Sequence, residues 1–249
     1  MKWIELRNMQ PINGALNEHI PLLGERHENA LLRVPHENTD LFRSIYFEYK
    51  FLGFIEVGGR FRKRNPSEQY EFTRKAAETG LRVLPPLDKK GTDLVYHFFP
   101  TAKTLDVFLS DSETKEANTV IYQLIEDLFS AHSKGVVYGD RWSRNILIVP
   151  EYGALHIDFD LEISGPYARE FEVAQLAYYA LSGGKEKVMF TLAQLLGSRH
   201  DWFNFSMVEK FMNGHARYFN NTPYGGIQNQ TEIFLTLLSD SMHKKSKST

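Results

Sequence analysis

Three side chains between residues 140 and 158 have the types and the spacing that transfer of a phosphoryl group to a hydroxyl would need. Asp140 carries a carboxylate that can orient a hydroxyl and accept its proton. Asn145 and Asp158 add an amide oxygen and a second carboxylate. Magnesium prefers such hard oxygen ligands and needs only one or two carboxylates, because it keeps several waters. The pattern therefore predicts a catalytic carboxylate beside a magnesium site.

A hairpin must bring the two candidate metal ligands together, because Asn145 and Asp158 lie apart along the chain. Short apolar runs at residues 146–149 and 155–158 predict two strands, with Glu151-Tyr152-Gly153 as the turn between them. Such a hairpin returns Asp158 to the side of Asn145, where both oxygens can meet one metal ion.

The first hundred residues predict mainly strands. We expect strands at 30–34 and 93–98. Residues 44–57 are rich in aromatic and β-branched side chains, and they predict a hairpin with residues 60–62 across Gly58-Gly59. A helix is expected over 66–79, because its start has the residue types of a reciprocal cap, namely Asn65, Pro66 and Glu68.

Beyond residue 100 the pattern is mainly helical. Apolar side chains at residues 118–133 recur at spacings of one, three and four, which predicts a helix that ends at Gly135. Further helices are expected at 171–181, 185–196, 207–219 and 231–242. The chain is therefore predicted to be an α+β protein, with a small antiparallel sheet in residues 1–99 and a mainly helical part in residues 100–249.

The composition narrows the possible functions. The chain has 249 residues, a formal net charge of -2 and no cysteine. Disulfides, thiolate metal sites and cysteine nucleophiles are therefore excluded, and no strong net charge attracts nucleic acid. We find neither a signal-peptide pattern nor an apolar run of about 20 residues, so we expect a soluble, cytoplasmic protein with no membrane span. The oligomeric state has no readable signature.

The stretch around Asp140 resembles the catalytic and metal-binding loops of the protein-kinase-like superfamily. The family pattern is His-(Arg or Gly)-Asp, four residues, Asn, and then Asp-Phe-Gly or a relative of it. Here Tyr138-Gly139-Asp140 corresponds to the first triplet and Asp158-Phe159-Asp160 to the last. The Gly139 form is similar to aminoglycoside and choline kinases, RIO kinases and the Bud kinases of the KEOPS complex. The second triplet is most similar to bacterial lipopolysaccharide-core sugar kinases.

This resemblance implies a two-lobe kinase-like fold, with ATP between a nucleotide-binding lobe (1–99) and a catalytic and acceptor-binding lobe (100–249). It implies Asp140 as the catalytic base, with Asn145 and Asp158 as Mg²⁺ ligands. The reaction would move the γ-phosphoryl group of ATP to a hydroxyl.

The nucleotide lobe carries a weaker resemblance. Residues 14–17 and then 30–35 are similar to the choline-kinase pattern of a phosphate loop followed by a strand bearing arginine. Arg33 would clamp the phosphates as a fixed cation, and a solvated arginine on an edge strand is the alternative. Three other basic residues compete for the role, namely Lys50, Lys63 and Arg64.

The helix at 66–79 resembles the helix whose glutamate pairs with that cation. Glu68 and Glu71 are the candidates, and a solvated helix face is the alternative for each. The distance from the C-terminal end of the helix favours Glu68 as the partner of the cation. Glu68 is also expected to cap the helix, and this role would leave Glu71 as the partner. Residues 94–100 resemble the strand and hinge that hold adenine.

Some positions depart from the family pattern. Tyr138 replaces the usual histidine, and its phenol could pack and form a hydrogen bond beneath the metal loop. Asp160 replaces a glycine and is either a supporting carboxylate or a loop cap. Glu172 resembles an acidic residue that supports the catalytic loop, although a helix cap is the favoured interpretation.

Three functions stay open at this point. The first is a small-molecule or sugar kinase, which the Gly139 form and the missing activation segment favour. The second is an atypical protein kinase of the RIO or Bud type, which the compact size favours. The third is a nucleotide-binding module without catalysis, which the Tyr138 substitution suggests. The acceptor itself is not identified by any pattern in the chain.

Overall fold

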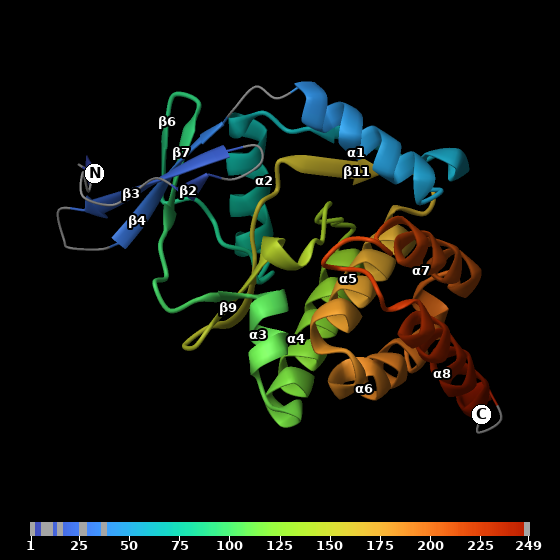
Figure 1. The fold of residues 1–249 in the computed structure, drawn as a ribbon. Helices are drawn as coiled ribbons and strands as arrows, with labels where there is room; N and C mark the ends of the chain where they lie inside the picture. The colour runs from blue at the N-terminus through green and yellow to red at the C-terminus, as the bar shows by residue number, and fades with distance from the viewer. Residues whose placement is uncertain (1–2, 6–11, 14–16, 25–28, 36–38, 247–249) are drawn as a thin grey trace.

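The computed structural model describes residues 3–5, 12–13, 17–24, 29–35 and 39–246. Small antiparallel sheets come mainly from the N-terminal part, and helices dominate the C-terminal part. In Figure 1 the largest sheet and helix α2 lie on one side of the molecule, and α3 to α8 lie on the other. The predicted α+β class is confirmed.

The largest described sheet has six antiparallel strands in the order β1-β3-β4-β7-β6, with β2 paired to β3. Its small core consists of Leu22, Ala30 and Val95. The strands expected at 30–34 and 93–98 are confirmed as β4 and β7. The bounds are β1 (Trp3–Glu5), β2 (Ile12–Asn13), β3 (Asn17–Gly24), β4 (Asn29–Pro35), β6 (Asp88–Lys90) and β7 (Asp93–His97).

The hairpin predicted from residues 44–57 is wrong, because this segment is mostly helical. Helix α1 (Thr39–Phe51) is followed by the 3-10 turn η1 (Ile55–Val57). The apolar residues that pack on the core recur at spacings of three and four, which suits a helix rather than a strand. They are Phe42, Ile45, Tyr49 and Leu52. The aromatic residues that suggested a strand lie exposed on the other face, namely Tyr46, Phe47 and Phe51.

Strand β5 (Arg60–Lys63) exists as expected but has a different partner. It pairs antiparallel with β11 (Leu161–Ser164), about a hundred residues later in the chain. Figure 1 shows α1 lying along β11, above α7. The first part of the chain is therefore attached to the segment that immediately follows the candidate site.

Helix α2 (Pro66–Glu78) begins with the predicted cap. The Asn65 side chain accepts a hydrogen bond from the Glu68 backbone, and the Glu68 side chain accepts one from the Asn65 backbone. Pro66 occupies the first helical position, where its missing N–H costs nothing. The helix ends before Gly80, whose φ of 81° is easily reached by glycine.

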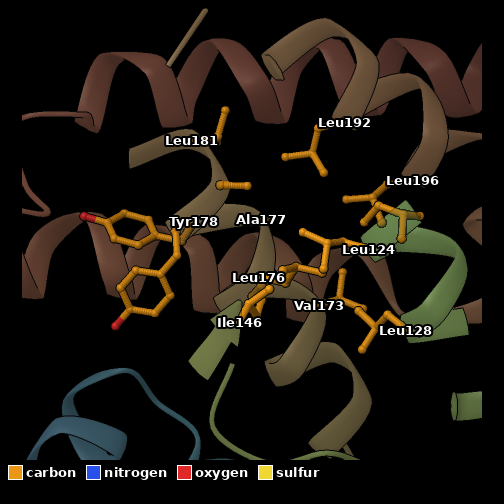
Figure 2. Close-up of a cluster of buried hydrophobic side chains, with 14 of the residues drawn as sticks. Leu124, Leu128, Ile146, Val173, Leu176, Ala177, Tyr178, Leu181, Leu192 and Leu196 are labelled. Carbon is orange, nitrogen blue, oxygen red and sulfur yellow. The ribbon is translucent and has the colours of Figure 1, made fainter. Parts of the chain in front are cut away.

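The helical part is built around α5, whose side chains are buried along most of its length. Figure 2 shows residues of α5 packed between Leu124 and Leu128 of α4 and Leu192 and Leu196 of α6. The five predicted helices in this part are present as α4 (Thr114–Ser133), α5 (Ala168–Gly184), α6 (Glu186–Gly197), α7 (Phe205–Tyr218) and α8 (Gln228–Ser246). The short helix α3 (Leu105–Asp111) was not predicted.

The main hydrophobic core extends across the expected boundary at residue 100. Tyr49, Leu52 and Phe54 belong to the same buried cluster as Phe171 and Phe211 of the helical part. The Phe54 and Phe171 rings are stacked with their centroids 4.3 Å apart. Within the described residues, no helix is long and apolar enough to cross a membrane.

Candidate active site

The hairpin predicted between Asn145 and Asp158 is present. Strand β9 (Ile146–Val149) pairs antiparallel with β10 (Gly153–His156), and His156 lies opposite Ile146. The short strand β8 (Lys103–Thr104) pairs with the outer edge of β9. The hairpin joins the loop that carries Asn145 to the loop that carries Asp158.

Gly139 allows the loop before Asp140 to approach the chain that follows Asp160. Its φ is 110°, which L-residues rarely adopt. A Cβ atom at this position would lie 2.1 Å from the carbonyl oxygen of Leu161. Only glycine fits here, so the structure gives a physical reason for the residue that precedes Asp140.

Asp140 is half-buried and is held by a residue of α5. The Nε2 atom of Gln175 donates a hydrogen bond of 3.1 Å to Oδ1 of Asp140. Burial raises the pKa of Asp140 to about 6, and the charge of Asp158 adds to this effect, while Arg141 and the Gln175 hydrogen bond oppose it. A carboxyl group with a pKa near neutrality is suited to accept a proton and release it again.

Asn145 and Asp158 are brought together through the backbone. The N–H of Ile157 donates a 2.9 Å hydrogen bond to the Asn145 carbonyl oxygen. The Asn145 side chain donates through Nδ2 to the Asp140 carbonyl at 3.0 Å, which leaves the amide oxygen Oδ1 available as a ligand. Asp158 has a φ of 58° and a partly exposed side chain, so its carboxylate lies where solvent and ligands can reach it.

Arg33 of β4 is the cation that meets this carboxylate. Its Nη2 atom lies 2.5 Å from Oδ1 of Asp158 and 3.1 Å from Oδ2 of Asp160. Its Nη1 atom donates a 2.5 Å hydrogen bond to Oε1 of Gln69. Burial would lower the pKa of Arg33, but the two carboxylates raise it above the usual value, so the guanidinium stays charged.

Neither Glu68 nor Glu71 pairs with Arg33, contrary to the expectation from the sequence. Glu68 caps α2 and bonds Arg62 at 2.9 Å, and Glu71 is exposed. The side chain that reaches Arg33 is Gln69, because α2 turns Gln69, Thr73 and Ala76 toward the core. These residues follow one another at spacings of four and three, which is typical of one buried helix face. This pattern could have indicated from the sequence that Gln69 points inward.

The three competing basic residues have surroundings different from those of Arg33. Lys50 is exposed on α1, and Lys63 lies 5.6 Å from the centre of the Phe42 ring. Arg64 is buried and donates to the Phe159 carbonyl oxygen at 3.0 Å, so it holds the backbone of the loop that carries Asp158. Of the predicted phosphate loop at residues 14–17, residues 14–16 lie outside the described residues.

A layer of buried side chains supports both loops from beneath. The Tyr138 ring stacks on His156 with centroids 4.5 Å apart and lies 5.8 Å from the Phe159 ring. Tyr138 thus packs under the loop that carries Asp158, as predicted, but its hydroxyl has no hydrogen-bond partner among the described residues. Arg141 is completely buried and approaches Nδ1 of His156 at 3.3 Å and the Ile157 carbonyl at 3.5 Å.

Glu172 supports the loop before Asp140 and, contrary to the favoured expectation, does not cap a helix. It is fully buried on α5, four residues after the helix begins. One carboxylate oxygen accepts a 3.0 Å hydrogen bond from the Gly139 backbone, and the other lies 2.7 Å from Nε2 of His132. Glu172 therefore links α4 and α5 to the residue that precedes Asp140.

The donor set fits a magnesium ion bound together with phosphates. Among the residues that the structure describes, no three His, Cys, Asp or Glu side chains form a complete metal site. Magnesium does not need such a set, because one or two protein oxygens, phosphate oxygens and waters complete its shell. Asn145 and Asp158 provide that number of protein ligands, and Arg33 provides a cation beside them.

Comparisons with other proteins add no assignment. No protein-family model matches the chain, and no curated protein is significantly similar to it in sequence. The function must therefore be argued from the site itself.

Proposed function

We propose that this protein is an ATP- and Mg²⁺-dependent phosphotransferase that moves the γ-phosphoryl group to a hydroxyl of a small molecule or sugar. The observation that carries the proposal is the convergence of Asp140, Asn145 and Asp158 beside the buried cation Arg33. Each group has a separate task in phosphoryl transfer, and an ordinary structural loop would not require all four.

Asp140 orients the acceptor hydroxyl and takes its proton. The acceptor oxygen forms a bond to the γ-phosphorus, the bond between this phosphorus and its bridging oxygen breaks, and ADP leaves with that electron pair. Asn145 and Asp158 would hold Mg²⁺, which would supply positive charge to the phosphate oxygens. Arg33 exchanges its contact with Asp158 for the phosphates, where a planar guanidinium can donate two parallel hydrogen bonds.

Thermal unfolding with ATP, with and without magnesium, tests the nucleotide and metal assignments. At about 100 times its dissociation constant, bound nucleotide adds roughly 2.7 kcal/mol to the free energy of unfolding. We expect a magnesium-dependent rise in Tm for the wild type and its loss in Asp158→Ala. A wild-type protein that shows no response to ATP in either condition would contradict the proposal.

Asp140→Asn tests the chemical step. This variant should still bind Mg-ATP, because Asp140 is not assigned to the metal. Its kcat should fall by roughly 10²–10⁴. The readout is ADP formation with a panel of hydroxyl compounds. Equal activity of the two proteins would remove Asp140 from the mechanism, and Mg-ATP binding without any turnover by the wild type would favour a binding module.

A further inference from the structure

Exposed aromatic rings gather on the outer side of helix α1 and at the end of α7. The rings are those of Tyr46 (43% exposed), Phe47 (54%), Phe51 (54%) and Tyr218 (36%). They are four of the ten large apolar side chains that lie exposed in the described part of the chain. The ring centroids of Phe51 and Tyr218 are 5.3 Å apart, and those of Tyr46 and Phe47 are 5.9 Å apart. Such a concentration of exposed apolar surface indicates a place where a partner binds.

The same side of α1 carries charged residues of both signs in a row. Four exposed residues follow one another at spacings of three, four and three, which places them in line along the helix. They are Asp40, Arg43, Phe47 and Lys50. The guanidinium carbon of Arg43 lies 5.8 Å from the centre of the Phe47 ring. Within the described residues, neither Asp40 nor Lys50 has an ion-pair partner. Since α1 lies at the edge of the molecule in Figure 1, another molecule can reach this row.

The row is complementary to itself when two copies of α1 lie antiparallel. A two-fold axis level with Ile45 places Asp40 of one copy opposite Lys50 of the other, because both lie five residues from that point. The same axis places Arg43 opposite Phe47, each two residues from it. Every contact occurs twice across a two-fold axis, so this pairing gives two ion pairs and two contacts between a guanidinium and a ring. Alternating spacings of three and four also keep a row of side chains on the seam between two packed helices.

We infer that this protein forms a two-fold symmetric dimer through the outer side of α1, with a second copy of the same chain as the partner. The argument is charge complementarity. The row has an acidic residue at its N-terminal end and a basic residue at its C-terminal end, and an antiparallel copy matches both ends. The rings of Tyr46, Phe51 and Tyr218 flank the row and lose contact with water in the dimer. The inference does not depend on the proposed phosphotransferase activity.

An anionic membrane is the competing partner for this surface, because aromatic and basic side chains together also suit a lipid surface. Asp40 lies in the same row, however, and anionic lipids would repel it. In the antiparallel dimer the same carboxylate has a partner in Lys50 of the second copy. The two partners therefore make opposite predictions for Asp40, since reversing its charge weakens the dimer and strengthens binding to anionic lipid.

Sedimentation velocity of the full chain measures the association. The protein is studied over about 1–100 μM, which spans micromolar dissociation constants, and the wild type should approach the mass of two chains at the upper end. Phe47→Lys puts an ammonium group opposite Arg43 of the second copy, so this variant should stay monomeric. Phe190→Lys is the matched control and should still dimerise. Phe190 is 60% exposed on α6, which lies on the opposite side of the molecule from α1 (Figure 1).

Exchange of charges tests the antiparallel register. Lys50→Asp puts two carboxylates opposite each other twice in the dimer, so the dissociation constant should rise by roughly 10- to 100-fold. Asp40→Lys should have an effect of similar size. The double variant Asp40→Lys with Lys50→Asp restores opposite charges, and its dissociation constant should return to within about three-fold of the wild-type value. Both positions are exposed, so we expect every variant to fold, and thermal unfolding checks this.

Three results would overturn the inference. The first is a wild type that stays monomeric over the whole concentration range. The second is a dimer that persists in Phe47→Lys, or that the double variant restores no better than either single variant. The third is a monomer that binds vesicles of phosphatidylcholine and phosphatidylserine, with tighter binding by Asp40→Lys, because this result would assign the outer side of α1 to a membrane.

Discussion

At the scale of single residues, Arg33 connects the two parts of the chain at the candidate site. It comes from the N-terminal sheet, and it contacts Asp158 and Asp160 more than a hundred residues later. Burial and the neighbouring charge of Asp158 raise the pKa of Asp160 to about 7, and Arg33 opposes this rise. Two adjacent carboxylates would repel each other strongly without a cation between them.

Arg33→Met should therefore destabilise the protein. Removing one partner of a buried ion pair costs about 3–5 kcal/mol, and the lower end applies here because Asp158 is partly exposed. Thermal unfolding should show the loss. The double variant Arg33→Met with Asp160→Asn should recover part of it, because one of the two carboxylates is then neutral. If the double variant is no more stable than the single one, repulsion between the carboxylates is not the cause.

Gly139 offers a second test at this scale. Gly139→Ala combines an unfavourable φ with a collision against the Leu161 carbonyl, so we expect a loss of several kcal/mol and no activity. Gly80→Ala is the matched control, because Gly80 also has a positive φ but no atom within 4 Å of the added carbon. The control should lose only about 1 kcal/mol. If the two variants lose similar amounts of stability, the collision with the Leu161 carbonyl is not the cause of the loss in Gly139→Ala.

At the scale of elements, α2 positions Arg33 through Gln69. The capping box at the start of α2 sets the helix start and hence the rotation that directs Gln69 inward. The Gln69 side chain also donates to the Arg64 carbonyl at 3.1 Å, so it joins α2 to the end of β5. A weaker helix start should affect the site and not the helix alone.

Asn65→Ala tests this connection. Loss of an N-cap costs about 1 kcal/mol, which corresponds to a fall in Tm of about 2–4 °C for a chain of this size. We also expect weaker binding of Mg-ATP, because Gln69 and Arg33 lose support. Glu71→Ala, on the exposed face of the same helix, should change the stability by less than about 0.5 kcal/mol. Unchanged stability in Asn65→Ala would show that the cap is dispensable.

At the scale of the whole molecule, several buried groups make stability depend on pH. The carboxyl pKa values of Glu48, Asp127 and Asp140 are raised to about 8, 7 and 6, chiefly by burial. Such groups bind more protons in the folded state, so they stabilise it at low pH and lose this effect as the pH rises through the folded pKa. Burial lowers the pKa of His215 to about 4 and that of His156 well below its usual value. At these histidines the folded state binds fewer protons than the unfolded state, so their effect is that stability rises with pH, but only below about pH 6.5.

We therefore expect stability to fall between pH 6.5 and pH 8.5, where only the carboxyl groups still titrate. Glu48→Gln should reduce this fall by on the order of 1 kcal/mol, since one pKa unit corresponds to about 1.4 kcal/mol. Chemical denaturation at the two pH values measures the difference. Wild type and variant with parallel pH dependences would contradict the raised pKa of Glu48.

Local sequence patterns determined the helices of the C-terminal part, the cap of α2 and the hairpin between Asn145 and Asp158. These features depend on side-chain periodicity and on hydrogen bonds between near neighbours, which a single sequence displays. The resemblance to the choline-kinase pattern suggested Arg33 as one of several candidate cations.

Only the tertiary structure decided which distant residues meet. Two contacts depend on packing between remote segments, namely the pairing of β5 with β11 and the contact of Gln69, rather than a glutamate, with Arg33. Residues 44–57 illustrate the reason: their aromatic content is compatible with a strand, but the core formed with Phe171 and Phe211 stabilises the helix. Burial against distant residues contributes more free energy than local propensity, so it overrides the local preference.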